Sequence, residues 1–242
     1  MSQSELASLR GEPSYVWRAG QERRLGMMAR WARLRDARVL VAGCGVGVYA
    51  GQIRQRYTPS VEAFDIEFER VQAARQSIPN ALVSAGEALP YATGHFDVVL
   101  SHEVIEHVAD DRHCLREMLR VTKVGGRILL FCPNRWYPFE THGHYWRGHY
   151  RFGNTPLINY LPAILRDKLA PHVRAYTRAE VRRLLEGETA EIIHHSRIYG
   201  GYDNIIARLG APALAMRNLL YQFEGTPLDT WALSHFVVIE KR

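Results

Sequence analysis

The sequence has little cysteine and no long apolar run, and each absence excludes a class of protein. Its three cysteines, Cys44, Cys114 and Cys132, are odd in number and lack CxxC spacing, which argues against a disulfide framework and a structural zinc site. The longest apolar runs, such as 128–132 and 236–239, are far shorter than the roughly 20 residues that span a bilayer, so a transmembrane protein is excluded. Residues 1–14 lack the basic start and apolar core of a secretory signal, and we expect a cytoplasmic protein.

Neither sign of charge dominates the chain. Lys and Arg number 31 against 25 Asp and Glu, which gives a formal net charge of +6, and the arginines are spread rather than clustered. A spread excess of this size is only a weak sign of an acidic partner, so we expect a small-molecule substrate rather than a nucleic acid. With 242 residues, 47% of them hydrophobic, the chain is long enough for one globular domain with a small appendage.

Short apolar strands alternate with amphipathic helices up to residue 133. Leu25, Met28, Ala29 and Ala32 have the i, i+3, i+4, i+7 spacing of an amphipathic helix, so residues 1–36 are predicted to be a helical N-terminal segment. Predicted strands follow at 38–42, 61–66, 81–84, 96–101 and 127–132. Predicted helices between them span 48–55, 67–77 and 112–121. This alternation is typical of an α/β fold with a parallel sheet covered on both faces.

The alternation is interrupted twice after residue 133. Residues 134–175 are rich in aromatic residues, histidine and proline, which predicts an inserted lid over the sheet. Thr177 and Glu180 then have the spacing of a capping box at the start of a helix. A strand is predicted at 190–198, a helix at 204–223 within a second insertion at 200–230, and a last strand at 234–240. Residues 37–242 are therefore predicted to be one domain with two insertions.

Gly43, Gly45 and Gly47 lie between the first predicted strand and the helix after it. Glycine is needed where the backbone turns tightly and a ligand approaches a helix start, because a Cβ would collide there. The dinucleotide motif has its third glycine one position later, at Val48, so NAD is disfavoured. Asp65 ends the second predicted strand, where a carboxylate can accept both hydroxyls of a ribose. Loop and carboxylate together predict a nucleoside ligand; turn chemistry alone and a helix N-cap role for Asp65 are the alternatives.

Five segments carry a family resemblance in their order and spacing: VLVAGCGVG (39–47), FDIE (64–67), GEALPY (86–91), FDVVLSHEVIEHV (96–108) and RVTKVGGRILLFCPN (120–134). They resemble class I S-adenosylmethionine-dependent methyltransferases, in the group that includes quinone-biosynthesis enzymes. The resemblance implies a doubly wound, Rossmann-like sheet of seven strands with an antiparallel last strand and a lid after the fifth strand. It also implies S-adenosyl-L-methionine as the cofactor.

The resemblance further implies roles for single residues. The three glycines would surround the methionine part of the cofactor, Asp65 would hold the ribose, and Ile66 would pack on the adenine. Glu87 stands where the family usually has Asp, and it would face the adenine amino group. The implied cofactor-binding residues are Gly43, Cys44, Gly45, Gly47, Asp65, Ile66, Glu87, Ala88 and Ser101, with Cys44 expected to pack as a small residue rather than to react.

Methyl transfer needs little covalent machinery, because S-adenosylmethionine already carries a good leaving group and the protein mainly aligns the acceptor and excludes water. A general base with a pKa near the working pH helps a hydroxyl, phenol or amine acceptor, and histidine is the usual choice. His102 and His107 follow the fourth predicted strand. They are the predicted catalytic residues.

A helical turn directly after the fourth predicted strand would place Glu103, Glu106 and His107 on one side. Three interpretations stay open: an ordinary hydrogen-bonded turn, a general base, and a divalent metal site completed by His142 or His144. The E-x-x-E-H order is similar to that of metal-dependent O-methyltransferases acting on catechols and on the 3′-terminal ribose of RNA, both of which are chelating vicinal diols.

The aromatic lid is expected to build the acceptor pocket, as the segment after the fifth strand does in the family. Three alternatives remain for this segment. Its aromatic residues could form a mini-core, Arg147 and Arg151 could stack on nucleic acid bases, or residues 157–169 could contact a membrane surface. We expect methyl transfer to a small molecule, to oxygen or nitrogen rather than carbon. Metal-assisted O-methylation of a catechol or an RNA terminus, and cofactor binding without catalysis, stay open.

Overall fold

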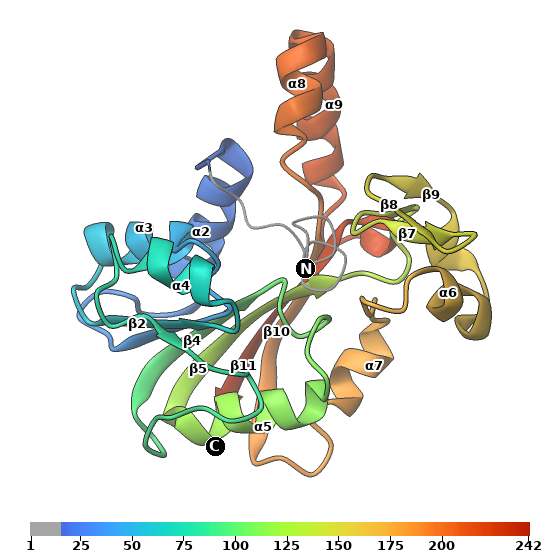
Figure 1. The fold of residues 1–242 in the computed structure, drawn as a ribbon. Helices are drawn as coiled ribbons and strands as arrows, with labels where there is room; N and C mark the ends of the chain where they lie inside the picture. Colours follow the sequence, from blue (N-terminus) through green and yellow to red (C-terminus); the bar gives the residue numbers. More distant parts are fainter. Residues whose placement is uncertain (1–15) are drawn as a thin grey trace.

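A central sheet of seven strands forms the core of the computed structural model, which describes residues 16–242 (Figure 1). Its strands are β1 (Val39–Ala42), β2 (Val61–Asp65), β3 (Leu82–Val83), β4 (Phe96–His102), β5 (Thr122–Pro133), β10 (Ala190–Ile198) and β11 (Ser234–Lys241). They lie in the order β10-β11-β5-β4-β1-β2-β3, with β11 antiparallel to both neighbours and the pairs from β5 to β3 parallel. The predicted doubly wound α/β sheet with an antiparallel last strand is confirmed.

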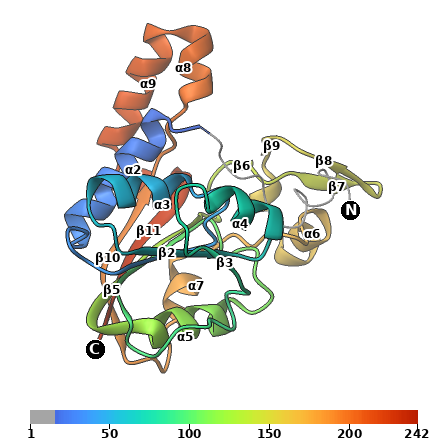
Figure 2. The same ribbon diagram turned by 60° about the vertical axis from the view of Figure 1, so that its left-hand side comes forward.

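Five helices cover the two faces of this sheet (Figures 1 and 2). They are α2 (Ala19–Trp31), α3 (Val48–Arg56), α4 (Phe68–Ala74), α5 (Asp111–Val121) and α7 (Arg178–Arg183). Successive strand residues point to opposite faces, so Val39 and Val41 pack in the core with α2, α3 and α4, while Leu40 and Ala42 pack in the core with α5 and α7. Both faces are buried, which explains the nearly continuous apolar strands.

Several element boundaries differ from the predicted ones. The helix predicted at 67–77 ends at Ala74, where turns lead to the buried Ile78, and the strand predicted at 81–84 is reduced to Leu82–Val83. The strand predicted at 127–132 begins already at Thr122, because the pairing of β4 with β5 shifts register between Phe96 and Val98 and accommodates Gly125 and Gly126. At the N-terminus α2 confirms the predicted helix, and residues 1–15 of the predicted segment 1–36 lie outside the described residues.

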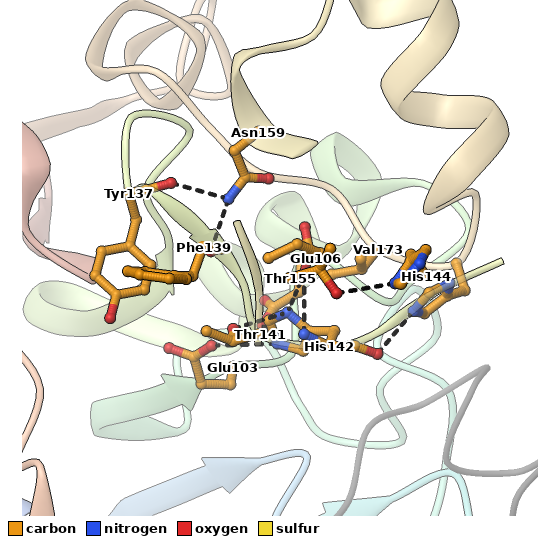
Figure 3. Close-up of polar contacts among 12 residues, drawn as sticks. Glu103, Glu106, Tyr137, Phe139, Thr141, His142, His144, Thr155, Asn159 and Val173 are labelled. Carbon is orange, nitrogen blue, oxygen red and sulfur yellow. Dashed lines mark hydrogen bonds and ion pairs between the residues drawn. The ribbon is translucent and has the colours of Figure 1, made fainter. Parts of the chain in front are cut away.

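The lid after β5 contains two small sheets and two short helices. Its elements are β6 (Phe139–Glu140), β7 (His144–Trp146), β8 (His149–Arg151), β9 (Thr155–Pro156), η1 (Ile158–Tyr160) and α6 (Ala163–Leu169). Asn159 donates to the carbonyls of Tyr137 and Phe139 at 3.2 and 3.0 Å and so fixes the chain before β6 (Figure 3). Arg166 of α6 is buried against Glu140, which places this cation inside the lid and not on the surface considered for residues 157–169.

The second insertion is helical, as predicted, and forms a hairpin of two helices. Gly210, with φ of 63°, separates α8 (Asp203–Leu209) from α9 (Ala211–Gln222), and η2 (Pro227–Trp231) leads into β11. The hairpin projects away from the sheet (Figure 1). The predicted capping box is confirmed, since Thr177 Oγ1 accepts from Glu180 N–H and Glu180 accepts from Thr177 N–H. No helix in residues 16–242 is long and apolar enough to cross a membrane.

Candidate active site

The glycine loop between β1 and α3 adopts the left-handed backbone that favours glycine. The φ angles of Gly43, Gly45 and Gly47 are 61°, 54° and 87°. A Cβ at Gly43 would lie 2.4 Å from Val104 Cγ2, and one at Gly47 would lie 3.2 Å from the Cα of Ala74. These glycines are therefore required both by the backbone angles and by close packing of the loop on its neighbours.

Asp65, at the end of β2, is only 4% exposed and is bonded to two turns. Its Oδ2 accepts from the N–H of Gly45 at 2.8 Å, and its Oδ1 accepts from the N–H of Glu67 at 3.0 Å. The carboxylate thus ties the glycine loop to the start of α4, whose N-cap is Glu67 and not Asp65. Because each carboxylate oxygen has two lone pairs, these bonds leave Asp65 able to accept from a ribose.

A cavity of about 950 Å³ opens beside the glycine loop and extends to the lid. This volume lies at the upper end of the range for ligand pockets, so it can hold a nucleoside cofactor together with an acceptor. Five of the predicted cofactor-binding residues line it, namely Gly43, Gly45, Asp65, Ile66 and Glu87. The structure brings them together from three separate segments of the chain.

The other four predicted cofactor-binding residues, Cys44, Gly47, Ala88 and Ser101, do not line the cavity. Burial raises the pKa of the Cys44 thiol to about 12, which suits the packing role expected for it. Ser101 is fully buried within β4. Strand periodicity explains this, because Ser101 faces the opposite side of the sheet from its neighbours Leu100 and His102, which both line the cavity.

Glu87 stabilises one rim of the cavity. Its Oε1 accepts from the N–H groups of Ala109 and Asp110 at 2.8 and 3.2 Å, which joins the loop after β3 to the loop after β4. All three residues line the cavity. The contact of Glu87 with an adenine amino group stays a prediction. The hydrogen bonds to Ala109 and Asp110 explain why the Glu87 side chain lies where it does.

Three cavity residues come from helices that sequence reasoning did not connect to the site. Gln21 and Arg24 belong to α2, and Tyr49 belongs to the first turn of α3. Burial raises the pKa of Tyr49 to about 12, and the nearby Arg24 cation partly opposes this shift. The apolar stripe of α2 indicates its buried side, but only the packing of α2 beside the glycine loop reveals that its polar side meets the cavity.

The segment after β4 forms a tight turn instead of the predicted helical turn. Glu103 has φ of 55°, an uncommon angle for a residue with a Cβ, and the N–H of His107 closes the turn on the carbonyl of Val104 at 2.9 Å. Ile105 and Glu106 are therefore both buried, although the helical pattern separates them. The left-handed Glu103 directs its side chain to Ser234 and His142.

Four ionisable side chains from two distant segments meet at the lid end of the cavity. Figure 3 labels three of them, Glu103, Glu106 and His142. His142 Nε2 lies 3.7 Å from Glu103 Oε2 and 4.0 Å from Glu106 Oε1, and His107 Nε2 also lies 4.0 Å from Glu106 Oε1. One ligand atom each from Glu106, His107 and His142 falls within 4.8 Å of the others. Neither oxygen of the fully buried Glu106 has a hydrogen-bond partner among residues 16–242.

The charges in this cluster differ from those of free side chains. Burial opposes charge on His142, but its contacts with Glu103 and Glu140 raise its pKa to about 10. Interaction with His142 outweighs burial at Glu103 and holds the pKa of that carboxyl below its usual range. Burial, with the neighbouring Glu103 charge, raises the pKa of Glu106 well above its usual value. Without a further cation, Glu103 and His142 form an ion pair beside a neutral Glu106.

Both imidazoles of the cluster are oriented from their far side. His107 Nδ1 lies 3.3 Å from the carbonyl of His172, and His142 Nδ1 lies 3.2 Å from Glu140 Oε1. Each Nδ1 therefore donates outward, and each Nε2 is directed to the centre of the cluster. Glu140 is held in turn by Arg166 at 3.1 Å.

His144 takes no part in the cluster. Its Nδ1 lies 3.0 Å from Thr155 Oγ1, so of the two histidines considered for the site only His142 faces the glutamates (Figure 3). Residues two apart in an extended chain would point to the same side, but Gly143, with φ of 83°, turns the chain between His142 and the start of β7 at His144.

The two predicted catalytic histidines both line the cavity. The His102 ring packs between Tyr49 and Phe131, with ring centroids 4.9 and 5.2 Å away, and within the described residues its Nε2 has no hydrogen-bond partner. Burial lowers the pKa of His102 and of His107 to about 4. Both rings are thus neutral near pH 7, and each is a weaker base than one whose pKa lies near the working pH.

Comparisons with known proteins agree with this fold. A family model described as "Methyltransferase domain" matches residues 40–130. Ajmaline N-methyltransferase of Rauvolfia serpentina is 34% identical over 100 residues, and the ubiquinone biosynthesis O-methyltransferase of Xanthomonas oryzae is 32% identical over 119 residues. A solved S-adenosylmethionine-dependent methyltransferase from Mesorhizobium loti superposes with a TM-score of 0.63, covering 90% of this chain and 96% of that one at 17% identity.

The sequence matches span only part of each protein. They cover 38% and 46% of this chain, and 34% and 49% of the plant and bacterial relatives. The structural likeness extends over nearly the whole chain and concerns the fold. Residues 40–130 therefore match a methyltransferase domain, and the described chain has the fold of a solved S-adenosylmethionine-dependent methyltransferase.

Proposed function

We propose that this protein transfers a methyl group from S-adenosylmethionine to a hydroxyl oxygen of a small molecule, with a divalent cation held by Glu103, Glu106, His107 and His142. One observation carries the proposal: Glu106 is fully buried, yet neither of its oxygens has a partner among the described residues. A buried carboxyl in that state is costly unless a proton or a cation compensates it. Two imidazole nitrogens directed at the same oxygen favour the cation.

The geometry fits a metal better than a hydrogen-bonded cluster. The distances of 3.7 to 4.0 Å are too long for hydrogen bonds. Donor atoms around a cation at about 2.1 Å lie roughly 3.0 to 3.4 Å apart, so a small inward movement would complete the set. The contacts at each Nδ1, with a carboxylate for His142 and a carbonyl for His107, are those of metal-binding histidines.

Each part of the cavity has a task in this function. The glycine loop and Asp65 would hold the cofactor, while Tyr49 and Thr141 would line the space between cofactor and lid. A divalent cation would supply a Lewis acid that makes an acceptor hydroxyl easier to ionise. His102 would take up the released proton, because the nitrogen that His107 directs to the cluster is a proposed ligand of the cation.

The acceptor class follows from this arrangement. A molecule with two neighbouring oxygens, such as a catechol or a vicinal diol, could bind through both and present one to the methyl group. Relatives named as O-methyltransferase and N-methyltransferase show that the domain family serves both acceptor atoms. The proposed divalent cation favours oxygen here, because it would make a bound hydroxyl easier to ionise and would repel a cationic amine.

The test is a calorimetric titration of Mn²⁺ into the protein with S-adenosylhomocysteine present. Glu106→Gln matches the neutral acid in shape, so we expect it to fold, to bind S-adenosylhomocysteine normally and to bind Mn²⁺ at least about tenfold more weakly. Glu69→Gln, at an exposed position on α4, is the matched control and should bind Mn²⁺ as the wild type does.

Two results would count against the proposal. If Mn²⁺, Mg²⁺ and Zn²⁺ all fail to bind the wild type, the protein has no metal site there, and His102 or His107 is left as the general base. Failure of S-adenosylhomocysteine itself to bind would remove the methyl-transfer function as well.

A further inference from the structure

The α8–α9 hairpin is an exposed helical projection with an apolar surface. Most of its residues are exposed in the described part of the chain. Its large apolar side chains are 38% to 64% exposed: Ile205, Leu209, Leu214, Met216 and Leu219. Scattered exposed apolar residues are ordinary, but several on one short projection indicate an interaction surface.

The charge pattern of the hairpin identifies the kind of partner. Residues 204–223 contain Arg208 and Arg217 and no acidic residue. The acidic Asp203 and Glu224 lie at the base of the hairpin in contact with α2, so the projecting part carries only positive charge. An apolar projection of this kind complements a surface that is apolar inside and negative outside, which describes an anionic lipid bilayer. A second copy of the chain fits less well, because a symmetric contact would bring the arginines of both copies together.

The hairpin is also joined to the edge of the cavity. Its first residue, Asp203, accepts from the N–H of Gly20 at 3.3 Å, and Glu224, just after α9, pairs with Arg23. Both partners belong to α2, the helix that contributes Gln21 and Arg24 to the cavity. The base of the hairpin is thus fixed at the cavity side of the molecule while its tip extends outward (Figure 2).

We propose that the tip of the α8–α9 hairpin enters the headgroup boundary of an anionic membrane and docks the protein there. The leucines around Gly210 would reach the acyl boundary, and Arg208 and Arg217 would stay among the anionic headgroups. The hairpin is a better membrane-facing surface than residues 157–169. In that segment Arg166, which would have to reach the headgroups, is buried against Glu140. The proposal is independent of the metal at the cluster.

The experiment is co-sedimentation of the full chain with vesicles of equimolar phosphatidylcholine and phosphatidylglycerol, compared with phosphatidylcholine alone. The double variant Leu209→Asp with Leu214→Asp should pellet with the anionic vesicles at least about tenfold more weakly than the wild type, because both exposed leucines near Gly210 lose their transfer to lipid. Arg208→Gln should reduce binding by a smaller factor and weaken its dependence on salt.

Matched controls carry the same chemical changes elsewhere. Val124→Asp introduces the charge at a side chain that is 76% exposed near the start of β5, and Arg183→Gln removes a cation from exposed α7. Neither should change vesicle binding. Normal binding of S-adenosylhomocysteine by every variant would show that the fold and the cofactor site are intact.

Three outcomes would overturn the proposal. The first is failure of the wild type to pellet with anionic vesicles. The second is that Ile164→Asp on α6 reduces binding as much as the hairpin variants do, which would assign the membrane-facing surface to the lid. The third is that the protein is a dimer without lipid and that the leucine variants dissociate it, which would make a second copy the partner.

Discussion

At the scale of single residues, Arg24 has the clearest testable role beyond the metal cluster. It lines the cavity from α2 and lies close enough to His102 to help lower its pKa, which places the cation between the glycine loop and the end of β4. The methionine part of S-adenosylmethionine ends in a carboxylate and is expected at that loop. A carboxylate beside a part-buried arginine gains a charge-assisted hydrogen bond.

Replacing Arg24 by Met should weaken binding of S-adenosylhomocysteine by about 10- to 100-fold, the range expected when one charged hydrogen bond is lost. Calorimetric titration measures this, with thermal unfolding as the check on stability. Arg30→Met is the matched control, because Arg30 is exposed on the last turn of the same helix. Equal affinities for wild type and Arg24→Met would show that Arg24 does not contact the cofactor.

At the scale of elements, the lid is organised around a buried ion pair. Arg166 is 3% exposed and donates to Glu140 at 3.1 Å and to the carbonyl of Val173 at 2.7 Å. The carbonyl of His142 accepts from Tyr150 and contacts His172, and the rings of Tyr150, His172 and Tyr145 pack together. The expected acceptor lid and the alternative of an aromatic mini-core thus coexist, because the mini-core holds the lid that carries His142.

Arg166→Met should loosen the lid while the central sheet stays folded. Removing one partner of a buried pair leaves Glu140 uncompensated, at a cost of about 3–5 kcal/mol. We expect faster hydrogen exchange and proteolysis in residues 139–176, slower methyl transfer, and unchanged binding of S-adenosylhomocysteine. Arg183→Met, on an exposed face of α7, should change none of these.

The double variant Arg166→Met with Glu140→Gln separates charge from packing. It should recover part of the lid protection, since no buried charge is left unpaired. Protection in Arg166→Met as strong as in the wild type would mean that the pair does not hold the lid.

At the scale of the whole molecule, two histidines in the last two strands of the sheet, β10 and β11, make the stability of the fold depend on pH. His235 of β11 is fully buried, with Nε2 2.8 Å from the carbonyl of Tyr176 and Nδ1 2.9 Å from His195 Nε2 of β10. The pattern requires both rings to be neutral, since His235 donates to the carbonyl and accepts from His195. Burial lowers the pKa of His235 to about 4 and that of His195 to about 3.

The free energy of unfolding should therefore fall as the pH falls below about 6.5, where these histidines bind protons only in the unfolded chain. His235 alone should contribute about 3 kcal/mol between pH 6.5 and its folded pKa of about 4, and the contribution is fully present above pH 6.5. Urea unfolding at a series of pH values measures the slope.

His235→Asn should be less stable at pH 7, because it breaks the bonds to Tyr176 and His195, but its stability should depend less steeply on pH. His149→Asn, at an exposed position in β8, should keep the wild-type slope. Parallel slopes for wild type and His235→Asn would show that His235 does not control the acid response.

The local sequence determined the features that depend on neighbouring residues. Strand and helix alternation, the glycine loop, Asp65 at a strand end and the Thr177 capping box are all set by backbone geometry over a few positions. The boundaries that failed, such as the early start of β5 and the break at Gly210, are places where pairing and packing decide how far an element extends. Local propensity does not specify either.

Only the tertiary structure decided the composition of the site. Glu103, Glu106 and His142 form one cluster because the turn after β4 meets the lid, and Arg24 joins the cavity because α2 packs beside the glycine loop. The sequence offered His142 and His144 as equals, and the turn at Gly143 separated them. Contacts between distant segments depend on how elements pack, and no local pattern encodes them.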